Sequence, residues 1–134
     1  MIRAWLLAAA VVGFLSVSAG AAATHLAAGE QAAGLLRSGA LYGMVHAAAL
    51  LAVTAMAQAG GRSGLALTIA GWSFAIGALL FSISLFALAL TASGWLGMIT
   101  PFGGMGLLIG WASLAVHALS DANIHSTSGS EDRP

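Results

Sequence analysis

The sequence predicts an all-α integral membrane protein, a polytopic bundle of four transmembrane helices, and three observations lead to this fold class. Of the 134 residues, 60% are hydrophobic and 6% are charged, whereas about a quarter of the residues in an average soluble domain are charged. The intervals between the charged residues are long enough for four bilayer crossings. Small residues are abundant, with 31 Ala and 18 Gly, and such residues let membrane helices approach one another closely.

Charged residues mark out the predicted spans, since one crossing needs about 20 mostly apolar residues. There are 26 uncharged residues between Arg3 and Glu30, 24 between Arg37 and Arg62, and 58 from there to Asp121, enough for two crossings. The predicted spans are residues 5–24, 40–58, 65–90 and 100–119, with a turn at residues 91–94 between the last two. The polar residues 120–134 are predicted to form a disordered tail.

Each span is expected to be a helix because it is apolar on all sides and lacks the alternation of a half-buried strand. A helix also satisfies its own backbone hydrogen bonds in lipid. Small residues four positions apart indicate close packing, inside the bundle or at a dimer face. The predicted packing positions are Gly39 with Gly43 and Gly106 with Gly110, together with Ser16 with Gly20 and Ala19 with Ala23.

The first span has an alternative interpretation, a cleaved signal peptide, because Arg3, an apolar run and Ala19-Gly20-Ala21 match its three-part pattern. The apolar run is longer than an ordinary signal-peptide core, which favours a retained span. The arginines of the short loops then predict the orientation. Arg3 and Arg62 share one side with the tail and Arg37 stands alone on the other, so both termini are expected in the cytoplasm.

Composition also excludes several classes of function. The formal net charge is zero, so nucleic acid is not an expected partner. Without any Cys, the chain has no disulfide and no thiol chemistry. No Asp or Glu lies within a predicted span to orient a base, and there is no Ser-His-Asp or two-carboxylate set. We therefore predict that the protein is not an enzyme, and we expect no cofactor and no metal site.

The candidate functional site is a set of polar and helix-start residues predicted to lie in the outer half of the bundle. If the second span begins near Ala40, His46 lies about 9 Å below the outer face, and Tyr42 is one turn above it on the same stripe. Ser82 and Ser84 point about 200° apart, so only one of them can face His46. The full set is His25, Tyr42, His46, Ser82, Ser84, Thr100, Pro101, Gly103 and Gly104.

Two of these features have both a structural and a functional interpretation. A neutral His46 bonded to Tyr42, a facing Ser or a carbonyl would set helix register; with His25 it could instead ligate haem iron or copper, or relay a proton. Thr100 and Pro101 form an ordinary helix start, which beside Gly103 and Gly104 could also bind a small anionic or polar group. The structural interpretation is preferred for both. Among the tryptophans, Trp5 and Trp95 suit the membrane interface, and Trp72 and Trp111 suit packing.

Read in order, these segments resemble a family of small bacterial membrane proteins, the domain of unknown function 423 family, related to human transmembrane protein 256. Two elements carry the resemblance in the first half, Gly-Ala-x-x-Ala-His and Gly-x-x-Tyr-x-x-x-His-x-x-Ala-Leu. Thr24, Ile83 and Phe86 depart from the family pattern, and the missing hydroxyl at Phe86 weakens any polar network through the third span. The matching segments are residues 20–26 (GAAATHL), 38–51 (SGALYGMVHAAALL), 70–85 (AGWSFAIGALLFSISL) and 96–111 (LGMITPFGGMGLLIGW).

The resemblance implies a four-helix inner-membrane protein with the first span retained, and it implies no activity. The predicted function is that of a non-enzymatic packing or accessory module whose partners are the lipid bilayer and, in addition, other membrane proteins or further copies of the chain. Two alternatives remain. One is a transporter of small solutes or a proton-coupled carrier that uses His46, Tyr42 and the helix start at residues 100–104. The other is a haem- or metal-binding redox subunit built on His25 and His46.

Overall fold

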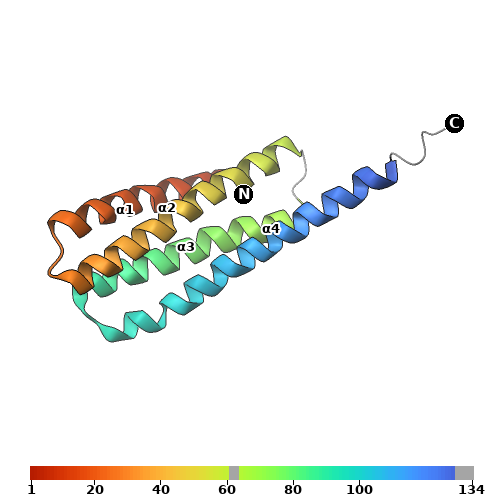
Figure 1. Cartoon of the computed structure of the whole chain (residues 1–134). Helices are drawn as coiled ribbons and strands as arrows, with labels where there is room; N and C mark the ends of the chain where they lie inside the picture. Colours follow the sequence, from red (N-terminus) through yellow and green to blue (C-terminus); the bar gives the residue numbers. More distant parts are fainter. Residues whose placement is uncertain (61–63, 129–134) are drawn as a thin grey trace.

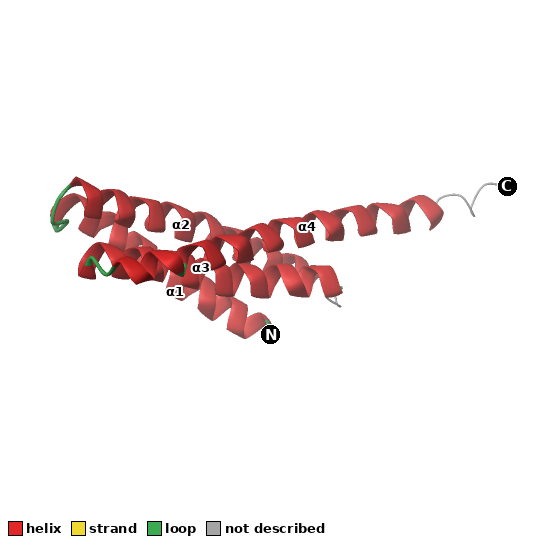
Figure 2. Cartoon of the chain, turned by 90° about the horizontal axis from the view of Figure 1, so that it is seen from below, coloured by secondary structure: helices red, strands yellow, loops and turns green. Residues whose placement is uncertain are grey.

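The chain folds into four long helices and one short 3-10 helix, as seen in a computed structural model that describes residues 1–60 and 64–128, with side chains to Ser120. All four long helices are long and apolar enough to span a membrane, and no strand occurs in these two ranges (Figures 1 and 2). The all-α membrane bundle predicted from the sequence is confirmed. The elements are α1 (Ile2–His25), α2 (Glu30–Ala59), α3 (Leu65–Thr91), η1 (Gly94–Met98) and α4 (Thr100–Ser128).

The second helix begins at Glu30, well before the predicted span start near Ala40. Gly29, at φ 131°, reverses the chain after α1 in a conformation that favours glycine. Glu30 then stands in the first turn, where its negative charge complements the helix dipole. Arg37 lies exposed two turns later, 3.9 Å from the Glu30 carboxylate. Both charges therefore lie on the exposed side of a helix that is already formed. The spacing of charges predicted where the apolar part of α2 begins, and not where the helix itself begins.

The fourth helix extends beyond its predicted end at residue 119, because α4 continues to Ser128. Residues 120–128, predicted to be part of a disordered tail, are thus helical, and residues 129–134 of that tail lie outside the described residues. The backbone of α4 projects past the ends of the other helices (Figures 1 and 2). Once a helix has been nucleated in the span, each added residue gains a backbone hydrogen bond, so polar composition alone does not end it.

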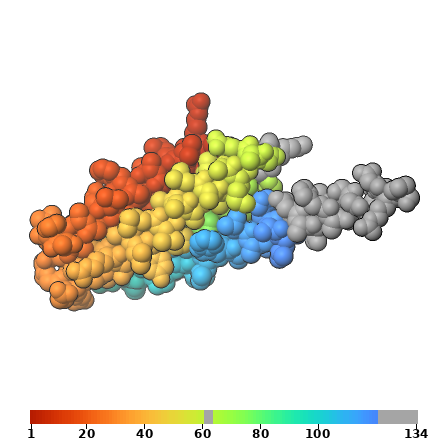
Figure 3. Space-filling model, turned by 45° about the horizontal axis from the view of Figure 1, so that its top comes forward, coloured from red at the N-terminus to blue at the C-terminus, as the bar shows by residue number. Residues whose placement is uncertain are grey.

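The helices pack mainly as neighbours in sequence, with α3 in contact with all of the others. Contacts are extensive between α1 and α2, between α2 and α3, and between α3 and α4, and α1 also touches α3. In contrast, α4 packs closely on α3 alone, and it is the least buried of the four spans. Figure 3 shows α1, α2 and α4 side by side on one face. Because α2 and α4 are not among the pairs of helices with extensive contact, the side between them is the open side of the bundle.

The core is filled by a few large side chains that fit over glycines. Trp5 is fully buried: its ring covers Gly71 of α3, where a Cβ would lie 2.5 Å from the ring, and it meets Trp72 edge to face at 6.3 Å. The prediction that Trp5 lies at the membrane interface is therefore wrong. Trp95, in η1, is 60% exposed. The bare backbone at Gly71 creates the space for an indole, and that space depends on α3, which no pattern within the first span could show.

The glycines predicted to serve packing all face neighbouring helices of the same chain. A Cβ on Gly39 would lie 2.5 Å from the ring of Phe86, one on Gly110 would lie 2.5 Å from the ring of Phe74, and one on Gly106 would lie 3.1 Å from the Cα of Gly77. Gly43 faces α1 and α3 in the same way, against two serine side chains. The space at each of these positions is taken up within the bundle.

Candidate functional site

His46, in the middle part of α2, is the polar centre of the site, and both of its ring nitrogens are engaged. Its Nδ1 lies 2.7 Å from the carbonyl oxygen of Tyr42, one turn earlier on the same helix. The indole Nε1 of Trp111, on α4, donates to its Nε2 over 3.1 Å. The side chain is only 5% exposed. His46 therefore joins two helices that have little other contact.

These two partners determine the tautomer of His46. The indole N–H of Trp111 can only donate, so Nε2 must act as the acceptor and carries no proton. Nδ1 then carries the proton and donates it to the Tyr42 carbonyl. This is the neutral imidazole, and an imidazolium would place two donors face to face at Trp111. In this arrangement no lone pair of His46 is free for a metal or for a substrate proton.

Aromatic rings surround the imidazole on the other sides. The ring of Tyr42 is stacked parallel to it at 6.2 Å, and that of Phe74 lies 5.7 Å away. Trp111 meets both His46, at 6.1 Å, and Phe74, at 5.2 Å, edge to face. Tyr42 also contacts Phe81 of α3, at 4.9 Å. The cluster therefore packs α2, α3 and α4 together through rings, with one hydrogen bond between helices inside it.

A groove of about 440 Å³ runs beside this cluster, between α2 and α4 and over α3. We refer to it as the α2/α4 groove. None of the side chains that line it is an Asp, Glu, Lys or Arg. His46 and Trp111 stand at one end, and Tyr42, Pro101 and Gly104 stand toward the start of α4. Its lining residues are Tyr42, His46, Phe81, Pro101, Gly104, Met105, Leu107, Leu108 and Trp111.

The two serines of α3 form separate contacts with different helices. Ser82 donates to the carbonyl of Gly39 on α2 over 3.0 Å. Ser84 is 2.8 Å from the hydroxyl of Thr100, at the start of α4, and it also donates to the carbonyl of Phe81, three residues earlier. Neither serine contacts His46 by a hydrogen bond in the described residues. Each buried hydroxyl thus ties α3 to one neighbour.

The remaining candidates are divided between the groove and the packing. Pro101 and Gly104 line the groove, whereas Gly103 faces α3, where a Cβ would lie 2.5 Å from the backbone nitrogen of Phe81. His25 ends α1 and has no place in the cluster around His46. Among the described residues, no group of three or more His, Cys, Asp or Glu side chains could hold a metal ion. The nine predicted residues therefore do not form one site.

Sequence reasoning missed two polar side chains that lie at contacts between helices. Trp111 was assigned to packing alone, although an indole N–H in an apolar span needs an acceptor, and that need was the available signal. Ser16 was assigned to helix packing; its hydroxyl is fully buried against Gly43 and, like Trp5 Nε1, it has no hydrogen-bond partner among the described residues. Both contacts join two different helices, and spacing along one span cannot reveal them.

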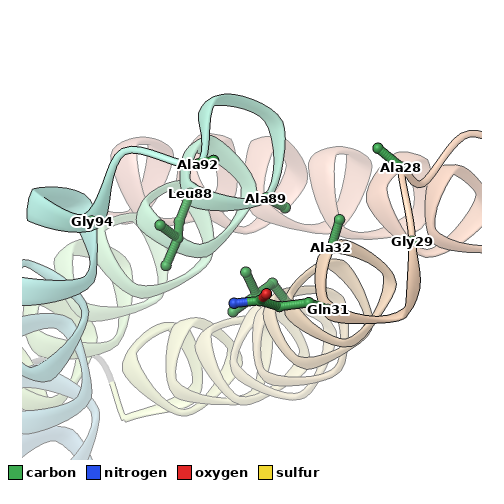
Figure 4. Close-up of a pocket in the computed structure, with 9 residues that line it drawn as sticks. Ala28, Gly29, Gln31, Ala32, Leu88, Ala89, Ala92 and Gly94 are labelled. Atoms are coloured by element: carbon green, nitrogen blue, oxygen red, sulfur yellow. The ribbon is translucent and has the colours of Figure 1, made fainter.

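A second pocket, of about 490 Å³, lies at the end of the bundle where α1 turns into α2 and α3 ends. Figure 4 shows the Gln31 side chain extending from α2 toward Leu88 across this pocket. Its walls are alanines, glycines and leucines apart from this one amide, and Gln31 itself is exposed. It contains none of the candidate residues and offers no titratable side chain.

Comparison with known proteins identifies the family of this four-helix arrangement. The family described as "Protein of unknown function (DUF423)" matches residues 19–104, which is more than half of the chain. The chain belongs to this family. The DUF423 match covers the aromatic residues of the site on α2 and α3 and the start of α4. Trp111 lies beyond the matched residues. No solved structure gives a significant match.

Individual DUF423-like relatives are named as membrane proteins. The chain is 41% identical over 109 residues to a UPF0382 membrane protein of Haemophilus influenzae, a match that covers 79% of this chain and 86% of the relative. It is 33% identical to the UPF0382 membrane protein YwdK of Bacillus subtilis, over 87% of this chain and 97% of the relative. It is 32% identical to the UPF0382 inner membrane protein YgdD of Escherichia coli, over 87% and 90%. Together with the four spans, these relatives make the chain a multi-pass inner-membrane protein.

Proposed function

We propose that the protein is a non-enzymatic membrane module that acts by packing, with α4 as the helix that meets another membrane protein or a further copy of the chain. The observation that carries this proposal is the engagement of both His46 nitrogens, one by Tyr42 and one by Trp111. A general base or an iron ligand needs a free lone pair at the point of reaction. Both nitrogens of His46 instead form hydrogen bonds within the bundle.

The exposed side of α4 supports this assignment of the contact. Three of the four spans bury more of their surface than α4 does, and α4 packs closely on α3 alone. Phe102 and Ile109, which do not line the α2/α4 groove, are 69% and 49% exposed. Association in a bilayer is driven by van der Waals packing, and a helix with one neighbour offers the largest area for it.

A photo-cross-linking experiment in native membranes tests the proposal. Benzoylphenylalanine is placed at Ile109 on α4 and, as a matched control, at Val11 on α1, which is 41% exposed. We expect one discrete protein adduct from the α4 position and lipid adducts only from the α1 position. Equal patterns from the two positions would show that α4 is an ordinary lipid-facing helix and would refute the proposal.

A further inference from the structure

We propose that the α2/α4 groove binds one ester-linked acyl chain of a neutral or zwitterionic bilayer lipid, with the Tyr42 hydroxyl donating to the ester carbonyl. Tyr42 is 47% exposed in the groove, and its hydroxyl forms no hydrogen bond to any residue that the structure describes. A hydroxyl within hydrocarbon that lacks an acceptor is unfavourable. The missing acceptor must come from outside the chain.

The position of the hydroxyl suits an ester group. Tyr42 follows Arg37, the last charged residue of α2, by five positions, or about 7.5 Å of helix rise. Side chains on a helix also lean toward its N-terminus, so the hydroxyl points toward the end of the bundle where α2 and α4 begin. This is the boundary region in which tyrosines occur in membrane proteins and where lipid polar groups meet the hydrocarbon.

The shape of the groove suits a chain that enters there and runs inward. It extends along α4 from Pro101 to Trp111, about 15 Å of helix rise. The hydrogen bond between Trp111 and His46 closes the deep end. No Asp, Glu, Lys or Arg lines the walls, so nothing in the groove selects a charged group. An elongated apolar body with one neutral oxygen at its outer end matches this lining.

A neighbouring helix fits the groove less well than an acyl chain. An α-helix is about 10–12 Å across with its side chains, so each turn has a volume of about 500 Å³, and a helix that packs along the groove brings several turns. The groove has about 440 Å³ in total. A second copy or a partner helix can therefore lie on the rim formed by α4, as proposed above, without entering the groove. The two proposals concern different surfaces, and the lipid site does not depend on a protein partner.

The test uses the purified full chain and counts bound lipids and copies of the chain separately, so failure of lipid binding is distinguished from failure of the α4 contact. The protein is reconstituted in dioleoylphosphatidylcholine vesicles and released in a mild detergent, and the mass of the intact complex is measured by native mass spectrometry. We expect one retained lipid per chain in the wild type. Gly104→Leu should lower this occupancy at least tenfold, because the added side chain enters the groove. The variant should still fold, since its Cβ would lie at an ordinary contact distance of 3.8 Å from the Phe81 ring. Gly34→Leu is the matched control, since nothing lies within 4 Å of its Cβ position.

A comparison of lipids tests the hydrogen bond without relying on a folded variant. The diether analogue of the same lipid lacks the carbonyl, and we expect the wild type to prefer the diester by about two- to tenfold. Tyr42→Phe should remove that preference. The proposal is overturned if the wild type holds both lipids equally, if Gly104→Leu keeps its lipid, or if the retained mass is a second chain.

Discussion

The indole Nε1 of Trp111 lies 3.1 Å from Nε2 of His46, so a tryptophan near the middle of α4 donates to a histidine near the middle of α2. These two helices otherwise have little contact. The bond sets the neutral tautomer with the proton on Nδ1 and closes the deep end of the α2/α4 groove. Three predictions follow from this contact and from the packing around it, and a fourth concerns the orientation of the chain in the membrane.

Replacement of Trp111 by Phe should lower the free energy of unfolding in detergent or bicelles by about 0.5–1.5 kcal/mol, since hydrogen bonds between membrane helices average about 0.6 kcal/mol. His46→Ala and the double variant complete a mutant cycle, and the two changes should be less than additive because they remove the same bond. Trp95→Phe is the control, being 60% exposed in η1. Additive effects within error would mean that the bond contributes nothing measurable.

Replacement of Gly103 by Ala should push α3 and α4 apart, because the new Cβ would lie 2.5 Å from the backbone nitrogen of Phe81, which cannot move as a side-chain tip can. Overpacking of this kind costs about 1–3 kcal/mol. Thermal unfolding followed by circular dichroism measures the change. Gly34→Ala, with open space at its Cβ position, should be neutral or stabilising. If both variants unfold at the same temperature, the close helix contact is not present.

Removal of the two buried serine hydroxyls should have opposite effects. Ser82→Ala loses its bond to the Gly39 carbonyl and should lower stability by about 0.5–1 kcal/mol. Ser16→Ala removes a hydroxyl with no partner among the described residues, so stability should stay the same or rise. Chemical unfolding in mixed micelles compares the two. A loss at Ser16 as large as that at Ser82 would show that Ser16 has an acceptor.

Single cysteines should report the orientation, because the chain contains no Cys of its own. Cysteine at Gly34 is expected to react with a membrane-impermeant maleimide in intact spheroplasts. Cysteine at Ser120, an exposed position on α4, should react only after the membrane is opened. This follows from the arginine distribution, which places both termini in the cytoplasm. Labelling of both positions from outside would mean that the chain crosses the bilayer an even number of times between them, and would contradict the three crossings of α2, α3 and α4.

Sequence reasoning could predict the fold class because lipid imposes it locally. Each span must be apolar and helical by itself, and a charge such as Arg62 marks a break without reference to the rest of the chain. The start of α2 could not be read in the same way, since Glu30 and Arg37 lie on an exposed side of an established helix. Charge positions limit the apolar stretch and say little about where helix geometry begins.

The site was predicted in part, because its residues are polar groups in apolar spans but their partners lie on other helices. His46 and Tyr42 are one turn apart on α2, so their contact could be expected from helical spacing. The contact of Trp111 with His46 depends on the position of α4 along the axis of α3. Close contact of the two backbones at glycines such as Gly77 and Gly106 sets that position. That offset is a property of packed helices and has no signature within either span.

The shared neighbour of all the other helices is α3, and this has a consequence for how the polypeptide is assembled during synthesis. α1 and α2 can pair as a hairpin as soon as both are in the bilayer. The indole of Trp5 can pack over Gly71 only after α3 has been inserted. α4 has no docking surface before that moment. The final packing of α1 and of α4 therefore requires α3, so we expect the bundle to complete its packing only after the third segment has been inserted.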